Sequence, residues 1–241
     1  MLEPKISIYG PSSQWKKHID KDFYFMKKSL IENDLKLFKI FLNNFGNWEK
    51  YLGIEEHIFI KKCNKNFILR NYLKNFVFLK QYQLWKYLNS NKKKSGSLHS
   101  PKFGNQIGAL IENKYFTTLA SFSNEIISTN LVNLVKNHNK PNIAELGAGY
   151  GQMAYFMMKK KHMCFIDIDI PETLCLAIYY LLKCFPKKKV LLYGEKKIKL
   201  KDTSKYDMIF FPYFKANEVK KLKIELFINK NSLGEMYPKT V

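Results

Sequence analysis

Apolar positions follow a helical period in the first part of the chain and a different pattern after about residue 95. Between residues 14 and 90, apolar side chains recur every three or four positions, which places them along one face of an α-helix. The clearest stripes are Leu35, Phe38, Phe41 and Leu42, and then Leu69, Leu73, Phe76, Leu79 or Lys80, and Leu84. We therefore predict a helical N-terminal extension over residues 1–95.

After residue 95, short apolar runs alternate with helical patterns. The runs at 143–147, 163–168, 190–193, 206–211 and 225–228 predict β-strands. Helices are predicted at 151–160 and 171–184, and a longer helical pattern runs from 112 to 136. Three of the runs are apolar almost throughout, as is typical of a parallel sheet covered on both faces. We predict a Rossmann-like α/β domain over residues 96–241, joined to the extension by an exposed linker or loop at 91–97.

The first predicted strand runs into three alternating glycines, Gly147, Gly149 and Gly151, and the second strand ends on Asp169. Glycine accepts a positive φ and lets the backbone approach a ligand closely. A carboxylate after the next strand can accept both hydroxyls of a ribose, so the pairing predicts a nucleotide-type cofactor pocket. Two simpler explanations remain open: a plain strand-to-helix connection at the glycines, and a helix cap at Asp169.

The glycine spacing points away from a dinucleotide. In the dinucleotide fingerprint the third glycine would stand at Gln152, whereas this chain has it at Gly151. The stretch from Glu145 to Gly151 instead resembles motif I, E-x-G-x-G-x-G, of class I S-adenosylmethionine-dependent methyltransferases. That resemblance implies a Rossmann-like methyltransferase sheet.

Two further stretches narrow the resemblance to the sugar O-methyltransferase family. Residues 168–181 are similar to its D-L-P-E-T-L followed by Y-Y-L, and residues 227–236 are similar to its I-N-x-x-S-x-x-E-M. A weaker similarity to F-G-N-P begins at Phe103, with Gln106 in place of the proline. The motifs occur in the family's order over residues 95–241, and three motifs in order are more specific than one.

The resemblance implies S-adenosyl-L-methionine as the cofactor. The glycine turn would pack against its methionine part, above Glu145, and Asp169 would hold the ribose, with Asp167 as the second choice. Glu195 follows the third strand, near where methyltransferases often contact adenine, although a turn residue explains it equally well. We expect Glu145 to meet a backbone donor or a cation, because an unpaired buried carboxylate is costly. The implied cofactor-binding set is Glu145, Gly147, Ala148, Gly149, Gly151, Asp169 and Glu195.

The resemblance also implies where a sugar or glycan acceptor would bind. Methyl transfer from a sulfonium needs in-line positioning and a base that removes the hydroxyl proton. Glu235 is the candidate base, and Asn229 and Ser232 would orient the sugar. A helix capping box, Ser232-x-x-Glu235, explains the same residues without catalysis.

The formal net charge of +21 and the pI near 9.6 raise the alternative of a nucleic-acid partner. Residues 211–214, Phe-Pro-Tyr-Phe, loosely resemble the N-P-P-Y element of amino methyltransferases but lack the leading Asn or Asp and the second proline. The basic runs at 92–94, 159–161 and 187–189 are scattered, so we expect solvated surface lysines rather than a polyanion groove. A non-catalytic interaction module is the third possibility.

The cysteines favour neither a metal site nor a disulfide framework. Cys63, Cys164, Cys175 and Cys184 have no C-x-x-C spacing and no histidine cluster beside them. The N-terminus lacks the apolar core of a signal peptide, and the longest apolar run, 174–182, is too short to span a membrane. A reducing cytoplasm is the expected location.

The class I resemblance implies a seven-stranded sheet, whereas only five strands are predicted here. Thirteen residues follow Ile228 and show no further strand pattern. We therefore expect a sheet that lacks its last two strands at the C-terminus. Its fifth strand would have an open edge, through which the chain could form a homo-oligomer.

Overall fold

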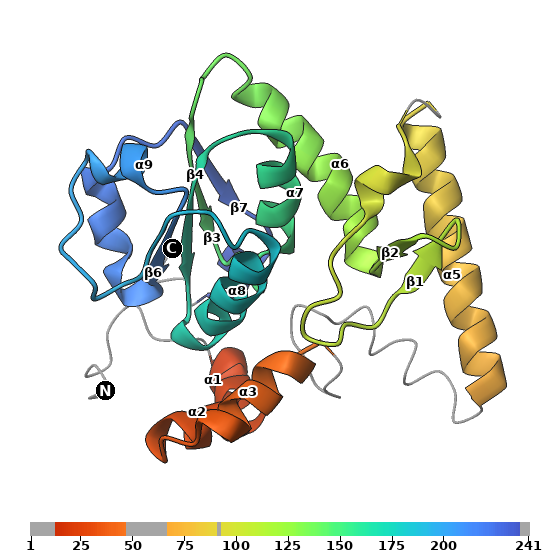
Figure 1. Ribbon diagram of the computed structural model, residues 1–241, viewed down its shortest axis with the longest axis horizontal. Helices are drawn as coiled ribbons and strands as arrows, with labels where there is room; N and C mark the ends of the chain where they lie inside the picture. The colour runs from red at the N-terminus through yellow and green to blue at the C-terminus, as the bar shows by residue number, and fades with distance from the viewer. Residues whose placement is uncertain (1–12, 47–66, 91–92, 237–241) are drawn as a thin grey trace.

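The computed structural model describes residues 13–46, 67–90 and 93–236 of the 241-residue chain (Figure 1). The N-terminal half contains α1 Ser13–Lys21, α2 Tyr24–Ile31, α3 Leu35–Asn44, α5 Phe67–Leu88, the 3-10 helix η1 Ser95–Leu98, β1 Ala109–Ile111, β2 Tyr115–Thr117 and α6 Leu119–Leu134. The C-terminal half contains β3 Asn142–Leu146, α7 Gln152–Lys160, β4 Cys164–Asp169, α8 Pro171–Cys184, β5 Val190–Leu191, α9 Asp202–Lys205, β6 Met208–Pro212, η2 Tyr213–Lys221, β7 Leu226–Asn229 and η3 Ser232–Glu235.

Five parallel strands form the main sheet, in the order β5-β6-β4-β3-β7. The α/β class and each of the five predicted strands are confirmed. Counted from β3 as the first strand, the sheet has the order 3-4-2-1-5. The central pair and the reversal of strand order beside β3 are those of a Rossmann sheet, but the fourth strand, β6, lies between the third and the second and not beside the first. The short strand β5 extends the edge beyond β6, and β7 forms the opposite edge of the described sheet.

The two faces of the sheet are covered by different elements. Right-handed crossovers place connections that run in opposite directions on opposite faces of a sheet. Accordingly, α7 and α8 share one core with Ile143, Phe165 and Phe210, whereas η2 shares the other with Ala144 and Ile166. The chain changes direction between β3 and β7, so the switch point of the sheet lies there.

The first three helices pack against the glycine turn. The ring of Phe45, just after α3, lies 5.5 Å from the ring of Tyr150 and 6.4 Å from that of Tyr179, measured between centroids. The hydroxyl of Tyr179 donates to Asn43 Oδ1 at 2.6 Å. Phe41 and Phe45 are fully buried in the core that contains α7 and α8. The group α1–α3 therefore covers the carboxyl edge of the sheet next to α8 (Figure 1).

A hairpin replaces the first part of the expected helix at 112–136. The strands β1 and β2 pair antiparallel, with Glu112 and Asn113 at positive φ in the turn between them. The helix α6 begins only at Leu119, where Thr118 and Ser121 form a capping box. A helical apolar pattern cannot exclude a short hairpin, so this prediction placed the start of the helix too early.

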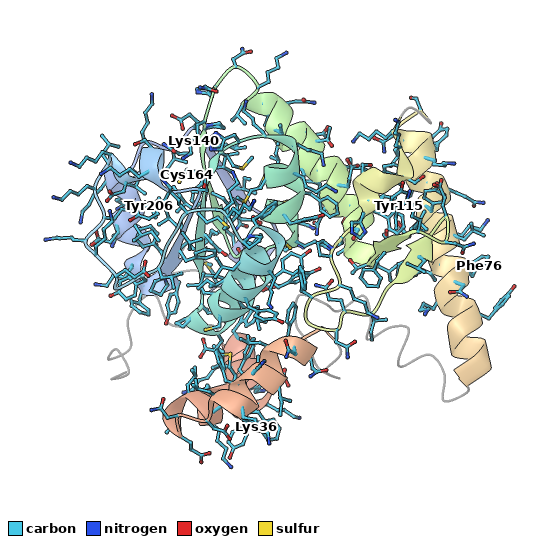
Figure 2. The ribbon with its side chains drawn as sticks, viewed as in Figure 1. Lys36, Phe76, Tyr115, Lys140, Cys164 and Tyr206 are labelled. Atoms are coloured by element: carbon cyan, nitrogen blue, oxygen red, sulfur yellow. The ribbon has the colours of Figure 1, made fainter. Side chains whose placement is uncertain are left out.

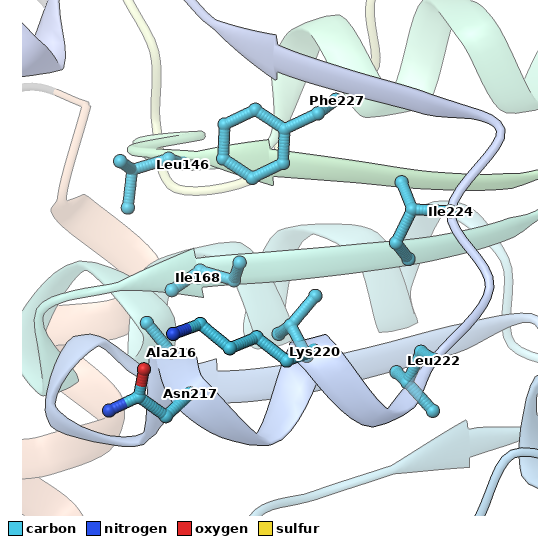
Figure 3. Close-up of a pocket in the computed structure, with 9 residues that line it drawn as sticks. Leu146, Ile168, Ala216, Asn217, Lys220, Leu222, Ile224 and Phe227 are labelled. Atoms are coloured by element: carbon cyan, nitrogen blue, oxygen red, sulfur yellow. The ribbon is translucent and has the colours of Figure 1, made fainter.

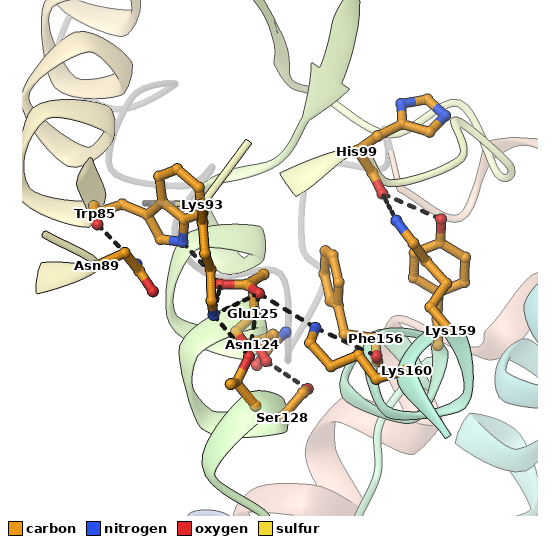
Figure 4. Close-up of polar contacts among 12 residues, drawn as sticks. Trp85, Asn89, Lys93, His99, Asn124, Glu125, Ser128, Phe156, Lys159 and Lys160 are labelled. Atoms are coloured by element: carbon orange, nitrogen blue, oxygen red, sulfur yellow. Dashed lines mark hydrogen bonds and ion pairs between the residues drawn. The ribbon is translucent and has the colours of Figure 1, made fainter. Parts of the chain in front are cut away.

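The described part of the segment at 91–97 packs against α5 and α6. Within it, Ser95 is buried and Lys93 Nζ lies 2.9 Å from Glu125 Oε1. The same buried carboxylate accepts from Trp85 Nε1 at 2.9 Å and pairs with Lys160 at 3.3 Å (Figure 4). Glu125 thus links α5, the segment, α6 and α7. The expectation that the segment is exposed was wrong, because amino-acid composition does not show such ion pairing.

The helix α5 confirms the helical pattern predicted over residues 69–84, but the apolar stripe does not face the core. Phe76, Leu79 and Leu84 are exposed, whereas Phe78 and Trp85 are buried against Leu98, Ile111 and Phe122. Periodicity identifies a helix with an apolar face, but it does not show which face is buried when both are apolar.

Candidate functional site

The glycine turn after β3 lies at the switch point of the sheet. Gly147, Gly149 and Gly151 all have positive φ, at 79°, 62° and 84°. A Cβ atom on Gly147 would lie 2.4 Å from Ser232 Cβ, so close packing requires glycine there. A Cβ on Gly149 would meet no atom within 4 Å. The backbone at Gly149 therefore faces open space, which is the arrangement that close approach of a ligand requires.

Asp169, the last residue of β4, holds the turn through backbone donors. The N–H of Gly149 donates to Asp169 Oδ2 at 3.0 Å, and the N–H of Ile170 donates to Oδ1 at 2.7 Å. The residue at the N-cap of α8 is Ile170, so Asp169 is not the cap of that helix. The structure thus brings together the glycine turn and the acid that the sequence paired. Together with a hydrogen bond from Thr173, these bonds leave about one acceptor position of the carboxylate for a hydroxyl donor.

Three acidic side chains from two neighbouring strands point to the same face of the sheet. Glu145 and Asp167 are partners in the β3–β4 register, and Asp169 lies two residues beyond Asp167. Glu145 and Asp167 are buried. Both carboxylate oxygens of Asp167 and Oε2 of Glu145 find no hydrogen-bond partner among the described residues. We call Glu145, Asp167 and Asp169 the acidic cluster.

Burial raises the pKa of each member of the acidic cluster. The pKa of Glu145 rises to about 8 through burial and the charge of Asp169, partly opposed by Lys230. The pKa of Asp167 rises well above its usual value through burial and its two acidic neighbours. The pKa of Asp169 rises to about 6, because burial outweighs the hydrogen bonds from Thr173, Ile170 and Gly149. Glu145 was expected to meet a backbone donor or a cation: the charge of Lys230 acts on it, while its Oε2 has no partner among the described residues and protonation removes much of the cost of burial.

The residues after β7 brace the end of β3. The Nδ2 of Asn229 donates to the carbonyl oxygen of Leu146 at 3.0 Å, and Ser232 Oγ donates to the same oxygen at 2.7 Å. Asn229 and Ser232 also contact each other. The N-cap residue of η3 is Asn231, which makes no side-chain cap bond, and Ser232 Oγ donates to Leu146 instead, so the Ser232–Glu235 capping box is not formed. The N–H of Leu233 donates to Asn229 Oδ1 at 3.2 Å. The structure thus places two of the predicted acceptor residues beside the glycine turn, with their polar groups used to hold it.

Glu235 lies at the same edge and contacts the N-terminal helix. Its charge raises the pKa of Asp169, which places the two carboxylates in electrostatic range. The indole Nε1 of Trp15 in α1 donates to Glu235 Oε2 at 2.8 Å. Trp15 was not predicted as a site residue, and a lone tryptophan 220 positions away offers no local signal.

A buried polar network beneath the turn was also missed from the sequence. Its hub is Gln152, at the start of α7, where Nε2 donates to Ser100, Thr118 and Ser121 at distances of 2.9 to 3.1 Å. Its Oε1 accepts from Asn124, whose Oδ1 in turn accepts from Lys230 at 2.8 Å. The only signal in the sequence was a glutamine that opens the helix before six apolar residues.

Glu195 is not part of this arrangement. It follows β5 at the far edge of the sheet, and its Oε2 accepts from the N–H of Leu192 at 2.8 Å. The structure therefore supports the turn-residue interpretation. Among the described residues there is no group of His, Cys, Asp or Glu side chains arranged to hold a metal ion. None of the described helices has the length and apolar character needed to cross a bilayer.

An apolar groove lies on the other face of the sheet, next to η2. It has a volume of about 390 Å³, and Leu146, Ile168 and Phe227 line its strand side (Figure 3). Lys220 and Asn217 from η2 lie along its opposite side. The groove and the acidic cluster are on opposite faces, because Leu146 and Ile168 alternate with Glu145 and Asp167 along their strands.

Comparison with known proteins gives no match: no protein-family model matches the chain, and neither does any curated protein. The residues of the site are therefore the basis on which a function is inferred.

Proposed function

We propose that the chain binds S-adenosylmethionine at the glycine turn and transfers its methyl group to a hydroxyl of a sugar or glycan. The observation that carries the proposal is the hydrogen bond from Gly149 N to Asp169 Oδ2 at the switch point. It joins an open glycine backbone to a carboxylate of the next strand, as a ribose-containing cofactor requires. The resemblance of residues 145–151, 168–181 and 227–236 to sugar O-methyltransferases supports the acceptor class.

The charge of the site favours a cationic cofactor over a dinucleotide. Lys230 is the basic side chain whose charge acts on Glu145, against the three carboxyls of the acidic cluster. Asp169, whose pKa is about 6, is the member of the acidic cluster that is mainly ionised at neutral pH. Its carboxylate would attract the sulfonium and ammonium groups of S-adenosylmethionine and repel a pyrophosphate. The electrostatics and the glycine spacing thus support the same cofactor.

In the proposed reaction the acceptor hydroxyl attacks the methyl carbon. The S–CH₃ bond breaks as the O–CH₃ bond forms, and the hydroxyl proton passes to a base. Glu235 is the base we propose, since it is exposed at the same edge and lies in electrostatic range of Asp169. Asn229 and Ser232 hold the strand end that orients this edge. The protein's main contribution is in-line positioning, because the sulfonium is already an activated leaving group.

Isothermal titration calorimetry with S-adenosylmethionine tests the cofactor. Asp169→Ala should weaken binding by roughly 1 to 3 kcal/mol, or about 5- to 150-fold, through loss of charge-assisted hydrogen bonds. Glu195→Ala is the matched control and should bind as the unchanged chain does. NAD⁺ should show no comparable heat. Equal affinity of the unchanged chain, Asp169→Ala and Glu195→Ala would exclude this pocket.

The net charge of +21 supports a second candidate, a nucleic-acid methyltransferase. The stretch 211–214 begins at the end of β6, where Pro212 is the register partner of Asp169, but it lacks the leading Asn or Asp and the second proline of N-P-P-Y. We therefore rank this candidate second. Methyl transfer from labelled cofactor to a glycan pool, compared with RNA and DNA pools, separates the two. Cofactor binding without transfer to any pool would favour a non-catalytic module.

A further inference from the structure

The helix α5 is apolar on two opposite faces. Its inner face buries Phe78 and Trp85 against α6 and the hairpin. On the opposite side, Tyr72, Phe76, Leu79 and Tyr87 are 66%, 48%, 52% and 78% exposed. Their spacing places these four side chains within one stripe, about 22 Å long. We call these four residues the outer face of α5; Figure 2 labels Phe76 on it.

The charged side chains of α5 itself are all basic, and Glu112 of the hairpin turn lies in electrostatic range of Lys86. The sequence of α5 contains Arg70, Lys74, Lys80 and Lys86 and no aspartate or glutamate over its 22 residues. The ammonium of Lys80 lies 5.5 Å from the centre of the Phe76 ring, on the exposed side of the helix. A helix face turned to water usually carries charges of both signs and few aromatic side chains. This one combines aromatic, aliphatic and cationic groups.

We propose that the outer face of α5 docks on an anionic phospholipid surface. Tyr72, Phe76, Leu79 and Tyr87 would enter the boundary between headgroups and acyl chains, and Lys80 would meet lipid phosphates. Aromatic side chains with long basic side chains suit this boundary, because each has an apolar body and a polar or charged end. The complete absence of acidic residues from α5 favours an anionic lipid over a protein partner, whose surface normally offers charges of both signs.

The position of α5 leaves the glycine turn free during docking. The helix lies on the far side of α6 from the main sheet, whereas α1–α3 cover the carboxyl edge (Figure 1). The inference therefore stands independently of the proposed methyl transfer. If both hold, the acceptor reaches the site from the side of the molecule that does not face the membrane.

Vesicle co-sedimentation of the full chain tests the docking. We expect binding to vesicles of phosphatidylcholine mixed with phosphatidylglycerol, little binding to phosphatidylcholine alone, and release as salt is raised. The double change Phe76→Glu with Leu79→Glu should lower binding at least about tenfold, and Lys80→Gln about fivefold. Leu134→Glu, at another exposed leucine on α6, is the matched control and should bind normally.

Each other outcome overturns the proposal. Equal binding to neutral and anionic vesicles would show that the basic residues of α5 have no role. Loss of binding in Leu134→Glu as great as in the α5 variants would show a non-specific charge effect. Sedimentation velocity completes the test: an unchanged chain that self-associates in solution, and α5 variants that do not, would identify a second copy as the occupant. Unaltered circular dichroism and melting temperature show that the variants are folded.

Discussion

Replacement of Glu145 by glutamine should make the protein more stable at alkaline pH. Glu145 is buried between β4 and β7, with Oε2 unpartnered among the described residues and its pKa raised to about 8. Glutamine keeps the shape of the side chain and stays neutral at every pH. The change therefore removes the ionisation of Glu145 and little else.

The size of the effect follows from proton linkage. The pKa of Glu145 is higher in the folded chain than its ordinary value of 4.5, so the folded state binds this proton more tightly. The resulting stability is fully present below pH 4.5 and is lost as the pH rises through about 8. At pH 8 the loss amounts to about 4 kcal/mol. Glu145→Gln avoids it and also relieves Asp167, whose pKa is raised partly by the charge of Glu145.

Urea unfolding followed by circular dichroism measures the effect. With a slope of about 2 kcal/mol per molar urea, the midpoint of Glu145→Gln should exceed that of the unchanged chain by roughly 2 M at pH 8. The two midpoints should converge near pH 4.5. Glu32→Gln, at an exposed carboxylate, is the control and should follow the unchanged chain. A Glu145→Gln variant that is less stable at pH 8 would refute the reasoning, because ionised Glu145 would then be stabilised by Lys230.

Four further outcomes are expected. Gly147→Ala should lower the free energy of unfolding by a few kcal/mol more than Gly149→Ala, because only the change at Gly147 brings a Cβ against Ser232. Gly149→Ala should instead lose cofactor affinity in calorimetry. Equal stability of the two variants would contradict the packing argument. Trp15→Phe removes the hydrogen bond to Glu235, so limited proteolysis within α1 should accelerate about fivefold. An unchanged rate of cleavage would show that this hydrogen bond does not hold α1 against the rest of the protein. If the lysines are solvated surface groups, binding to RNA or DNA should be largely lost between low and physiological salt, whereas salt-resistant, sequence-selective binding would favour the nucleic-acid candidate. The outer edge of β7, which no other described strand pairs with, should cause concentration-dependent self-association in sedimentation velocity, and a monomer at all concentrations would exclude it.

Local patterns explain what could be predicted from the sequence. The strands and the glycine turn depend on neighbouring residues, such as the apolar run before Gly147, and they were found within a residue or two. The pairing of the turn with Asp169 was also predicted, because the carboxyl ends of adjacent parallel strands meet at one edge.

Features that depend on distant segments could not be predicted. The network around Gln152 joins side chains from four separate parts of the chain, and Trp15 reaches Glu235 across 220 positions. No periodicity carries this information. Burial of the Phe78 side of α5 was missed for a related reason: the apolar stripe identified a face, but the partner that selects the buried face lies in α6 and the hairpin.

The position of β7 beside β3 has a consequence for synthesis of the protein. Ile143 of β3 pairs with Leu226 of β7, which is synthesised 83 positions later. One edge of β3 therefore stays unpaired until β7 has been made. At ribosomal rates of about 5 to 20 residues per second, that delay is roughly 4 to 17 seconds. During this time an apolar strand with unpaired backbone groups is exposed on the nascent chain. The emerging protein therefore has a period of vulnerability to misassociation that ends only when β7 leaves the ribosome, and holding chaperones would be most useful in that interval.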